Sequence, residues 1–239
     1  MTAALAWGAL AASSLVLGAW IGLIRTWGER LVGAVLGFGA GALISAVSFD
    51  LAQEGVRLGG GASVALGLAC GAATYFVANR LLARHEMPAG HAGVPSNAGS
   101  ALALGAFLDG VPEQLVLGIG LATEAGLSVS LLAAIFVSNL PEAIGSASAM
   151  RAAAQKPAAI LRLWTAVAVV CALATGVGFA IADTTSGDLQ AAIDGFAAGA
   201  LLVMLIDSMI PEAVRQAGDI AGLVTVLGFA VAAALSVIG

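Results

Sequence analysis

Apolar runs long enough to cross a membrane recur along the whole chain. They fall near 2–24, 31–53, 61–83, 99–121, 127–149, 160–182, 190–212 and 219–238, and charged or turn-forming residues separate them. A helix of roughly 20 apolar residues spans the hydrocarbon core of a bilayer. The pattern therefore predicts an all-α integral membrane protein with eight transmembrane helices, organised as a single transmembrane domain over 1–239.

The composition agrees with this prediction and excludes other classes of protein. Of the 239 residues, 60% are hydrophobic and only 10% are charged, whereas a soluble domain has about 25% charged residues. The net charge of −5 offers no basic surface for nucleic acid. The N-terminus lacks the positive stretch of a cleavable signal peptide, so we expect the first apolar run to remain as a helix.

The basic residues predict the orientation of the chain in a cell membrane. Lys and Arg are enriched in short cytoplasmic connections. Eight of the nine fall on alternate connections, and only Arg57 falls on the other side; the eight are Arg25, Arg30, Arg80, Arg84, Arg151, Lys156, Arg162 and Arg215. This asymmetry predicts a multi-pass protein with both termini external and with 84–98 as a cytoplasmic loop.

Two segments of the chain resemble each other and predict an internal repeat. The stretch Gly37–Leu43 (GFGAGAL) matches Gly195–Leu201 (GFAAGAL), and each is followed by an aspartate, Asp50 or Asp207. Under the predicted topology the two copies run in opposite directions. They therefore predict inverted repeats, formed by helices 1–3 and 6–8 around a central pair of helices 4 and 5, as in secondary transporters. Chance similarity among Gly, Ala and Leu is the alternative.

Carboxylates occur near the middle of the fourth and fifth predicted spans. Asp109 and Glu113 are four residues apart and so share a helix face, and Glu142 lies in the next span. A charged side chain at the bilayer centre costs roughly 2.5–3.5 kcal/mol on insertion scales. No Lys or Arg falls at a comparable depth. The three carboxylates are therefore either protonated or paired with a cation that enters from water.

Neutral oxygen atoms near these carboxylates favour a cation. Ser138 and Asn139 lie within one turn of Glu142, and Pro112 and Pro141 each free a backbone carbonyl four residues earlier. We therefore predict a metal site formed by Asp109, Glu113, Ser138, Asn139 and Glu142. A kinked helix in which Asp109 and Glu113 cap or pair locally is the alternative.

Two further predictions concern acids and histidines outside the central pair of spans. Asp50 and Asp207 lie a few residues inside the ends of their spans. We interpret them as cation-binding stations on the routes to and from the central site. His85 and His91 in the predicted loop are weak metal candidates, and a solvated loop is the favoured interpretation.

The Pro-Glu motifs of the two central spans are similar to those of the ZIP (Zrt/Irt-like) metal transporters. The fourth span of that family typically reads H-N-x-P-E-G, which is Asp109 to Gln114 here. The fifth typically reads H-E-x-P-H-E, which is Ser138 to Ala143 here. Both motif histidines are absent, so the chain resembles a divergent bacterial-type member. By position, the resemblance implies a transport site at Asp109, Glu113, Ser138 and Glu142, with a single metal.

The resemblance implies a transporter that moves a divalent cation towards the cytoplasm by alternating access, with the metal ion as substrate and no cofactor. Zinc is the family's usual cargo, but an all-oxygen site suits harder ions such as manganese; iron and cadmium also remain open. A homodimer is compatible with the resemblance. Two other functions stay open: a membrane-embedded enzyme that uses Glu113 and Glu142 as acid and base, and a metal-binding protein that does not transport. We expect no enzymatic activity, because no basic residue is placed to hold an anionic substrate beside these acids.

Overall fold

The computed structural model describes residues 1–25, 27–85, 98–122, 128–182 and 187–238, except for the side chains of 82–85, 98–109, 237 and 238. All regular elements in this part of the chain are helical, which confirms the predicted all-α class. The helices are α1 (Thr2–Ile24), α2 (Glu29–Ala46), η1 (Val47–Gln53), α3 (Glu54–Gly59), α4 (Gly61–His85), α5 (Ala98–Ala122), α6 (Val129–Ala152), α7 (Pro157–Ala182), α8 (Asp188–Met204), η2 (Leu205–Met209), α9 (Ile210–Ala217), η3 (Gly218–Ile220) and α10 (Ala221–Ile238).

Six helical segments among the described residues are long and apolar enough to cross a membrane, as expected of a multi-pass membrane protein. They are Thr2–Ile24, Glu29–Gly59, Gly61–Leu81, Val129–Ala152, Pro157–Ala182 and Asp188–Ser236. The last covers 49 residues, which include α8, α9 and α10, and the described apolar part of α5 is the shorter helix Gly110–Ala122.

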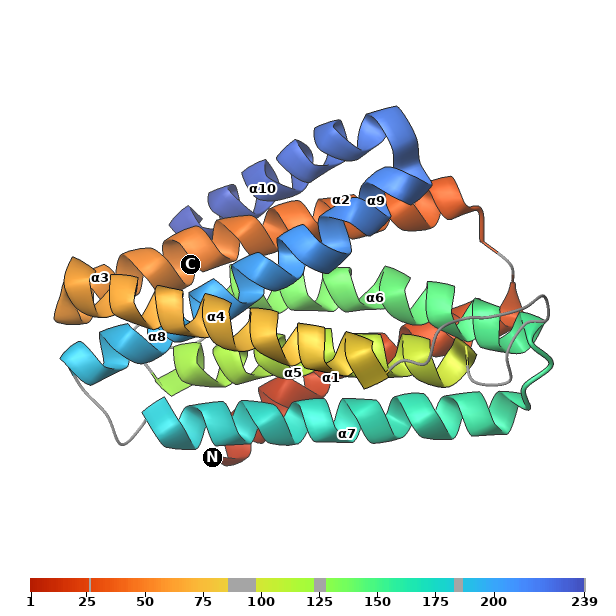
Figure 1. Ribbon diagram of the computed structural model, residues 1–239, viewed down its shortest axis with the longest axis horizontal. Coiled ribbons are helices and arrows are strands. Elements are labelled where there is room, and N and C mark those ends of the chain that lie inside the picture. Colours follow the sequence, from red (N-terminus) through yellow and green to blue (C-terminus); the bar gives the residue numbers. More distant parts are fainter. Residues whose placement is uncertain (26, 86–97, 123–127, 183–186, 239) are drawn as a thin grey trace.

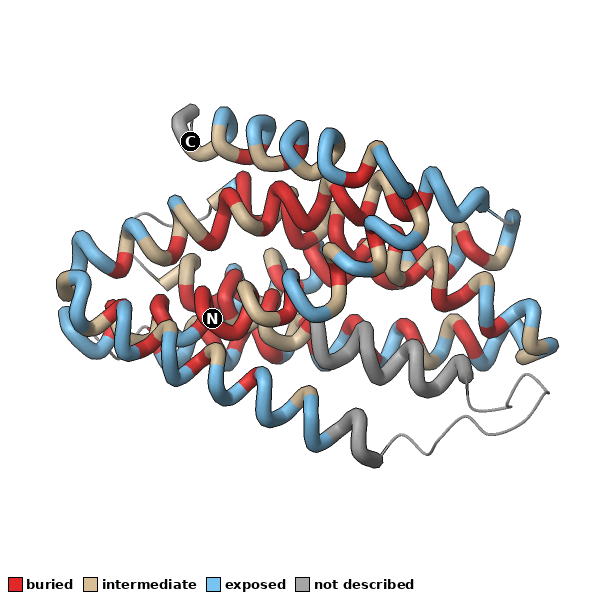
Figure 2. Tube along the Cα trace, turned by 45° about the horizontal axis from the view of Figure 1, so that its top comes forward, coloured by how far each residue is buried: buried red, intermediate tan, exposed pale blue. Residues whose placement is uncertain are grey.

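The long helices lie side by side in two groups (Figure 1). In one group α1 packs on α6 and α7, and α5 packs on α7 and α6. In the other α4 packs on α8 and α10 packs on α2. The groups meet mainly where α2 crosses α6. Buried positions follow the sides of the helices that face one another, and exposed positions follow the outer sides (Figure 2).

Glycines bring the helices of the second group into close contact. A Cβ atom added to Gly37 would lie 3.2 Å from Val224 Cγ2, and one on Gly41 would overlap the backbone of Thr225. In the same way, Gly195 and Gly199 lie directly against the backbone of α4. Small residues at these positions permit the close approach of helices that membrane proteins use. The repeated glycines of these two stretches are therefore packing residues.

Two helices of this group contain a π-helical segment, which the sequence did not predict. The segment η1 continues α2 into α3, and η2 continues α8 into α9. Asp50 lies in η1 and Asp207 lies in η2. Each of the two long helices ends at a glycine with positive φ, Gly60 (86°) and Gly218 (62°). A π-helical segment is rare and is often found at a functional site. Both aspartates therefore lie on backbone of this uncommon conformation.

Candidate functional site

Glu113 lies in the interior of the helical bundle, on α5. Its side chain is 1% exposed, and Ser138 on α6 is fully buried beside it. The Ser138 Oγ atom is 3.3 Å from Glu113 Oε1 and 3.0 Å from the Ile135 carbonyl oxygen. Because a hydroxyl has one proton, Ser138 donates to one of these acceptors at a time. The structure thus brings together two of the predicted metal ligands.

Glu142 lies one turn after Ser138 on α6 and is half-buried. Both Glu113 and Glu142 are close enough to the Cys171 thiol on α7 to act on it electrostatically. Cys171 is fully buried, and a Cβ atom added to Gly110 on α5 would lie 3.0 Å from its Sγ atom. The two glutamates therefore flank one small region between α5, α6 and α7.

The two cysteines of the chain, Cys70 and Cys171, differ in burial. Cys171 is buried, but Cys70 is exposed on α4. The place of Cys171 beside the glutamates could not be predicted, since it depends on the packing of α7 against α5.

Two buried amides add polar atoms near the glutamates. Asn139 is 1% exposed, and its Nδ2 atom has no hydrogen-bond partner among the described residues. Gln114, directly after Glu113, accepts a hydrogen bond of 2.6 Å from the Thr175 hydroxyl. The nitrogen and oxygen of an asparagine amide can exchange places by rotation. Asn139 can therefore present either a donor or an acceptor to a ligand at this position.

Close helix contacts on two sides hold α6 in position. A Cβ atom on Gly39 of α2 would lie 2.7 Å from Ser138 Cα, and one on Gly18 of α1 would lie 2.6 Å from the Leu140 carbonyl oxygen. Neither neighbouring atom is part of a flexible side chain. The two glycines therefore fix the backbone that carries Ser138, Asn139 and Glu142.

Asp50 interacts with the N-terminal end of α6 and not with the glutamates. Its Oδ2 atom accepts hydrogen bonds of 2.7 Å from Ser128 and 2.6 Å from Ser130. Ser128 also caps α6 by accepting a bond of 3.1 Å from the Leu131 amide. Leu131, Ala134 and Ile135, which belong to the apolar core, separate this cluster from Ser138 along α6. Asp50 thus belongs to a polar cluster with Ser128 and Ser130 that is separate from Glu113 and Ser138.

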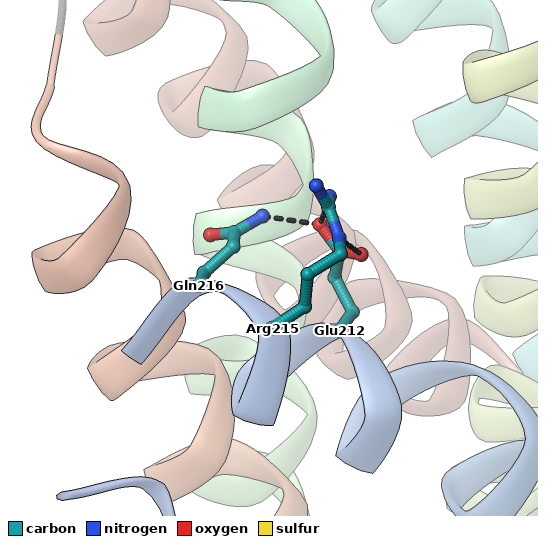
Figure 3. A network of polar contacts seen from close by, with 3 residues as sticks. All are labelled: Glu212, Arg215 and Gln216. Carbon is teal, nitrogen blue, oxygen red and sulfur yellow. Dashed lines mark hydrogen bonds and ion pairs between the residues drawn. The ribbon is translucent and has the colours of Figure 1, made fainter. Parts of the chain in front are cut away.

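Asp207 is exposed on η2, and none of the hydrogen bonds or ion pairs found in the described part of the chain joins it to the central residues. The two acids that follow the predicted stations are engaged locally. Glu54 forms an ion pair of 3.1 Å with Arg57. Glu212 contacts both Arg215 and Gln216 near the end of α9 (Figure 3). These contacts lie in α3 and α9, the last segments of the two long helices.

Three predicted candidates lie outside the described residues. They are the side chains of Asp109 and His85, and the whole of His91. Among the side chains that the structure does describe, no three His, Cys, Asp or Glu residues are grouped so that they could hold a metal ion. The central cluster of described residues therefore contributes two carboxylates together with hydroxyl and amide groups.

A further buried acid, Asp194 on α8, was not singled out in the sequence. It is 2% exposed, and Gln190 donates a hydrogen bond of 3.0 Å to its Oδ1 atom. The i, i+4 spacing of Gln190 and Asp194 was the available signal. Asp194 lies beside Gly55 of α3, close to Glu54.

Comparison with known proteins adds no assignment to these observations. A scan against known protein families finds no match for the chain, and a search of curated proteins finds none either. Neither comparison identifies the chain as a member of a known family.

Proposed function

We propose that the chain is a ZIP-like transporter that carries a divalent metal cation across the cell membrane towards the cytoplasm. The observation that carries the proposal is the burial of Glu113, at 1% exposure, against the Ser138 hydroxyl in an apolar helical bundle, with Glu142 on the neighbouring helix. Ionisable groups inside a membrane are costly and usually mark an ion or substrate pathway. A cation bound between the two glutamates would offset that cost.

The donor atoms favour a hard or borderline ion. Glu113, Glu142, Ser138 and Asn139 offer oxygen atoms, and the position of Asp109 one turn before Glu113 would add a third carboxylate. Oxygen ligands suit manganese comparatively well, while zinc and iron bind more strongly where imidazole is present. Zinc stays the first candidate by resemblance, with manganese as the ion that these residues favour.

We further propose that the helices form eight spans. A single straight helix of 49 residues would be about 74 Å long, more than twice the thickness of a bilayer core. The segment Asp188–Ser236 is interrupted by η3 and by the positive φ of Gly218, and α10 packs back along α2. These features support two spans in this segment. The position of α5 between α6, α7 and α8 supports a further span.

Alternating access is supported by the likeness between the two long helices that bear Asp50 and Asp207. Both pass through a π-helical segment, both end at a glycine with positive φ, and each packs its glycine-rich face on the last helix of the other copy. Gly33 lies against Gln216 and Gly59 against Asp188, so the two helices cross in opposite directions. Such inverted repeats can open a central site to each side in turn.

The proposal is tested by metal uptake into proteoliposomes. Wild type is compared with Glu113→Gln and Glu142→Gln for zinc, manganese, iron and cadmium. Glu212→Gln is the control, because Glu212 lies in the first turn of α9, in an ion pair with Arg215. We expect either central substitution to abolish uptake of the transported ion, while Glu212→Gln keeps it.

Equal flux in wild type and in both central variants would remove the glutamates from the mechanism. Metal binding by the wild type without any flux would identify a binding protein that does not transport. Insertion and monodispersity of every variant are checked first, so that lost uptake is not confused with lost folding.

A further inference from the structure

An apolar groove of about 430 Å³ lies between α4, α5, α7 and α8. Its walls include Tyr75 and Asn79 on α4, Pro112 on α5, Ile181 on α7 and Phe196 on α8. The volume falls within the range of about 300–1,000 Å³ typical of ligand sites. The groove is separate from the central carboxylates, although Pro112 immediately precedes Glu113.

The groove is continuous with the outer apolar surface of the bundle. Two of its lining residues, Ile181 and Phe196, are 46% and 41% exposed. Phe76 and Val77 beside it on α4 are also exposed, at 47% and 53%. All four belong to segments long and apolar enough to span a bilayer, so lipid chains would surround them. Ordered water needs two to four polar partners, which this apolar lining does not provide.

We propose that this groove binds a membrane lipid, with one acyl chain between α4 and α5. Among the described residues α4 and α5 make few direct contacts with each other, and the acyl chain fills the space between them. It thereby contacts the helix that carries Glu113. The proposal does not depend on metal transport.

The test is photo-crosslinking of the full-length protein in vesicles of phosphatidylglycerol and phosphatidylcholine. A trace of phosphatidylcholine carries a diazirine on its acyl chain, and mass spectrometry maps the labelled residues. We expect labelling concentrated on the groove wall. Ala78→Phe and Thr74→Phe, which fill the groove from α4, lower that labelling several-fold.

The matched control is Ala73→Phe, because Ala73 is exposed on the same helix but does not line the groove. It leaves groove labelling unchanged. Labelling spread evenly over the lipid-facing residues would overturn the proposal, as would equal labelling in Ala78→Phe and Ala73→Phe. Cross-links between two protein chains at the groove would assign it to a second copy of the protein and also overturn the proposal.

Discussion

At the scale of single residues, the central feature is that α5 and α6 each place a glutamate in the bundle interior. Ser138 connects the two helices chemically, because its hydroxyl lies between the Glu113 carboxylate and the Ile135 carbonyl. A hydroxyl that can turn its proton away from the carboxylate can also turn its oxygen towards a cation. Under the proposed function, Ser138 would therefore contact Glu113 when no metal is bound and would offer its oxygen when a metal is bound.

Ser138→Ala should weaken metal binding by several-fold. The variant loses a neutral oxygen and a buried hydrogen bond, which contributes about 0.5–1.5 kcal/mol. Ser146→Ala is the matched control, since Ser146 is buried eight residues later on α6 and its hydroxyl has no partner among the described residues. Isothermal titration with the transported metal measures both. Equal affinities of the two variants would exclude Ser138 from the site.

At the scale of helices, the close contact of α2 with α6 positions the site. Because Gly39 lies directly against the Ser138 backbone, an added methyl group must displace α6. We expect Gly39→Ala to lower the free energy of unfolding by about 1–3 kcal/mol through overpacking, and to weaken metal binding as well.

The control for this prediction is Gly145→Ala on α6, the helix that Gly39 contacts. A Cβ atom there would lie 4.0 Å from Val32 Cγ1, an ordinary contact. Replacing a helical glycine by alanine with no clash stabilises by up to about 1 kcal/mol. Thermal unfolding in detergent compares the two variants. A Gly39→Ala protein as stable as Gly145→Ala would contradict the assigned packing.

The sequence predicted the helix limits well where the apolar run alone determines them. The first apolar run, 2–24, coincides with α1 (Thr2–Ile24), and the predicted 160–182 lies within α7 (Pro157–Ala182). The π-helical segments could not be predicted, because a one-residue change in hydrogen-bond register leaves no hydrophobic pattern. The position of Cys171 and the burial of Asp194 depend on which helices pack together, and that is a tertiary property.

At the scale of the whole molecule, the proposed function requires a defined orientation in the membrane. The distribution of basic residues predicts that Lys156, between α6 and α7, is cytoplasmic and that Asp188, at the start of α8, is external. Both residues are exposed. We expect a membrane-impermeant maleimide added to intact cells to label Asp188→Cys but not Lys156→Cys.

This labelling experiment uses a Cys70→Ala background, since Cys70 is exposed and Cys171 is fully buried. After the membrane is permeabilised, both introduced cysteines should react. Labelling of Lys156→Cys in intact cells, with Asp188→Cys protected, would contradict the predicted orientation and reverse the proposed direction of transport.

The central claim is that Glu113 and Glu142 bind the same cation, and a double-mutant cycle of metal affinity tests it most directly. Titrations compare wild type, Glu113→Gln, Glu142→Gln and the double variant. If the two carboxylates share one ion, each single substitution lowers affinity about 10-fold or more, equivalent to about 1.4 kcal/mol. The double variant is then little worse than either single variant, because the effects of coupled residues do not add. Independent, additive losses, or wild-type affinity in either single variant, would contradict the claim.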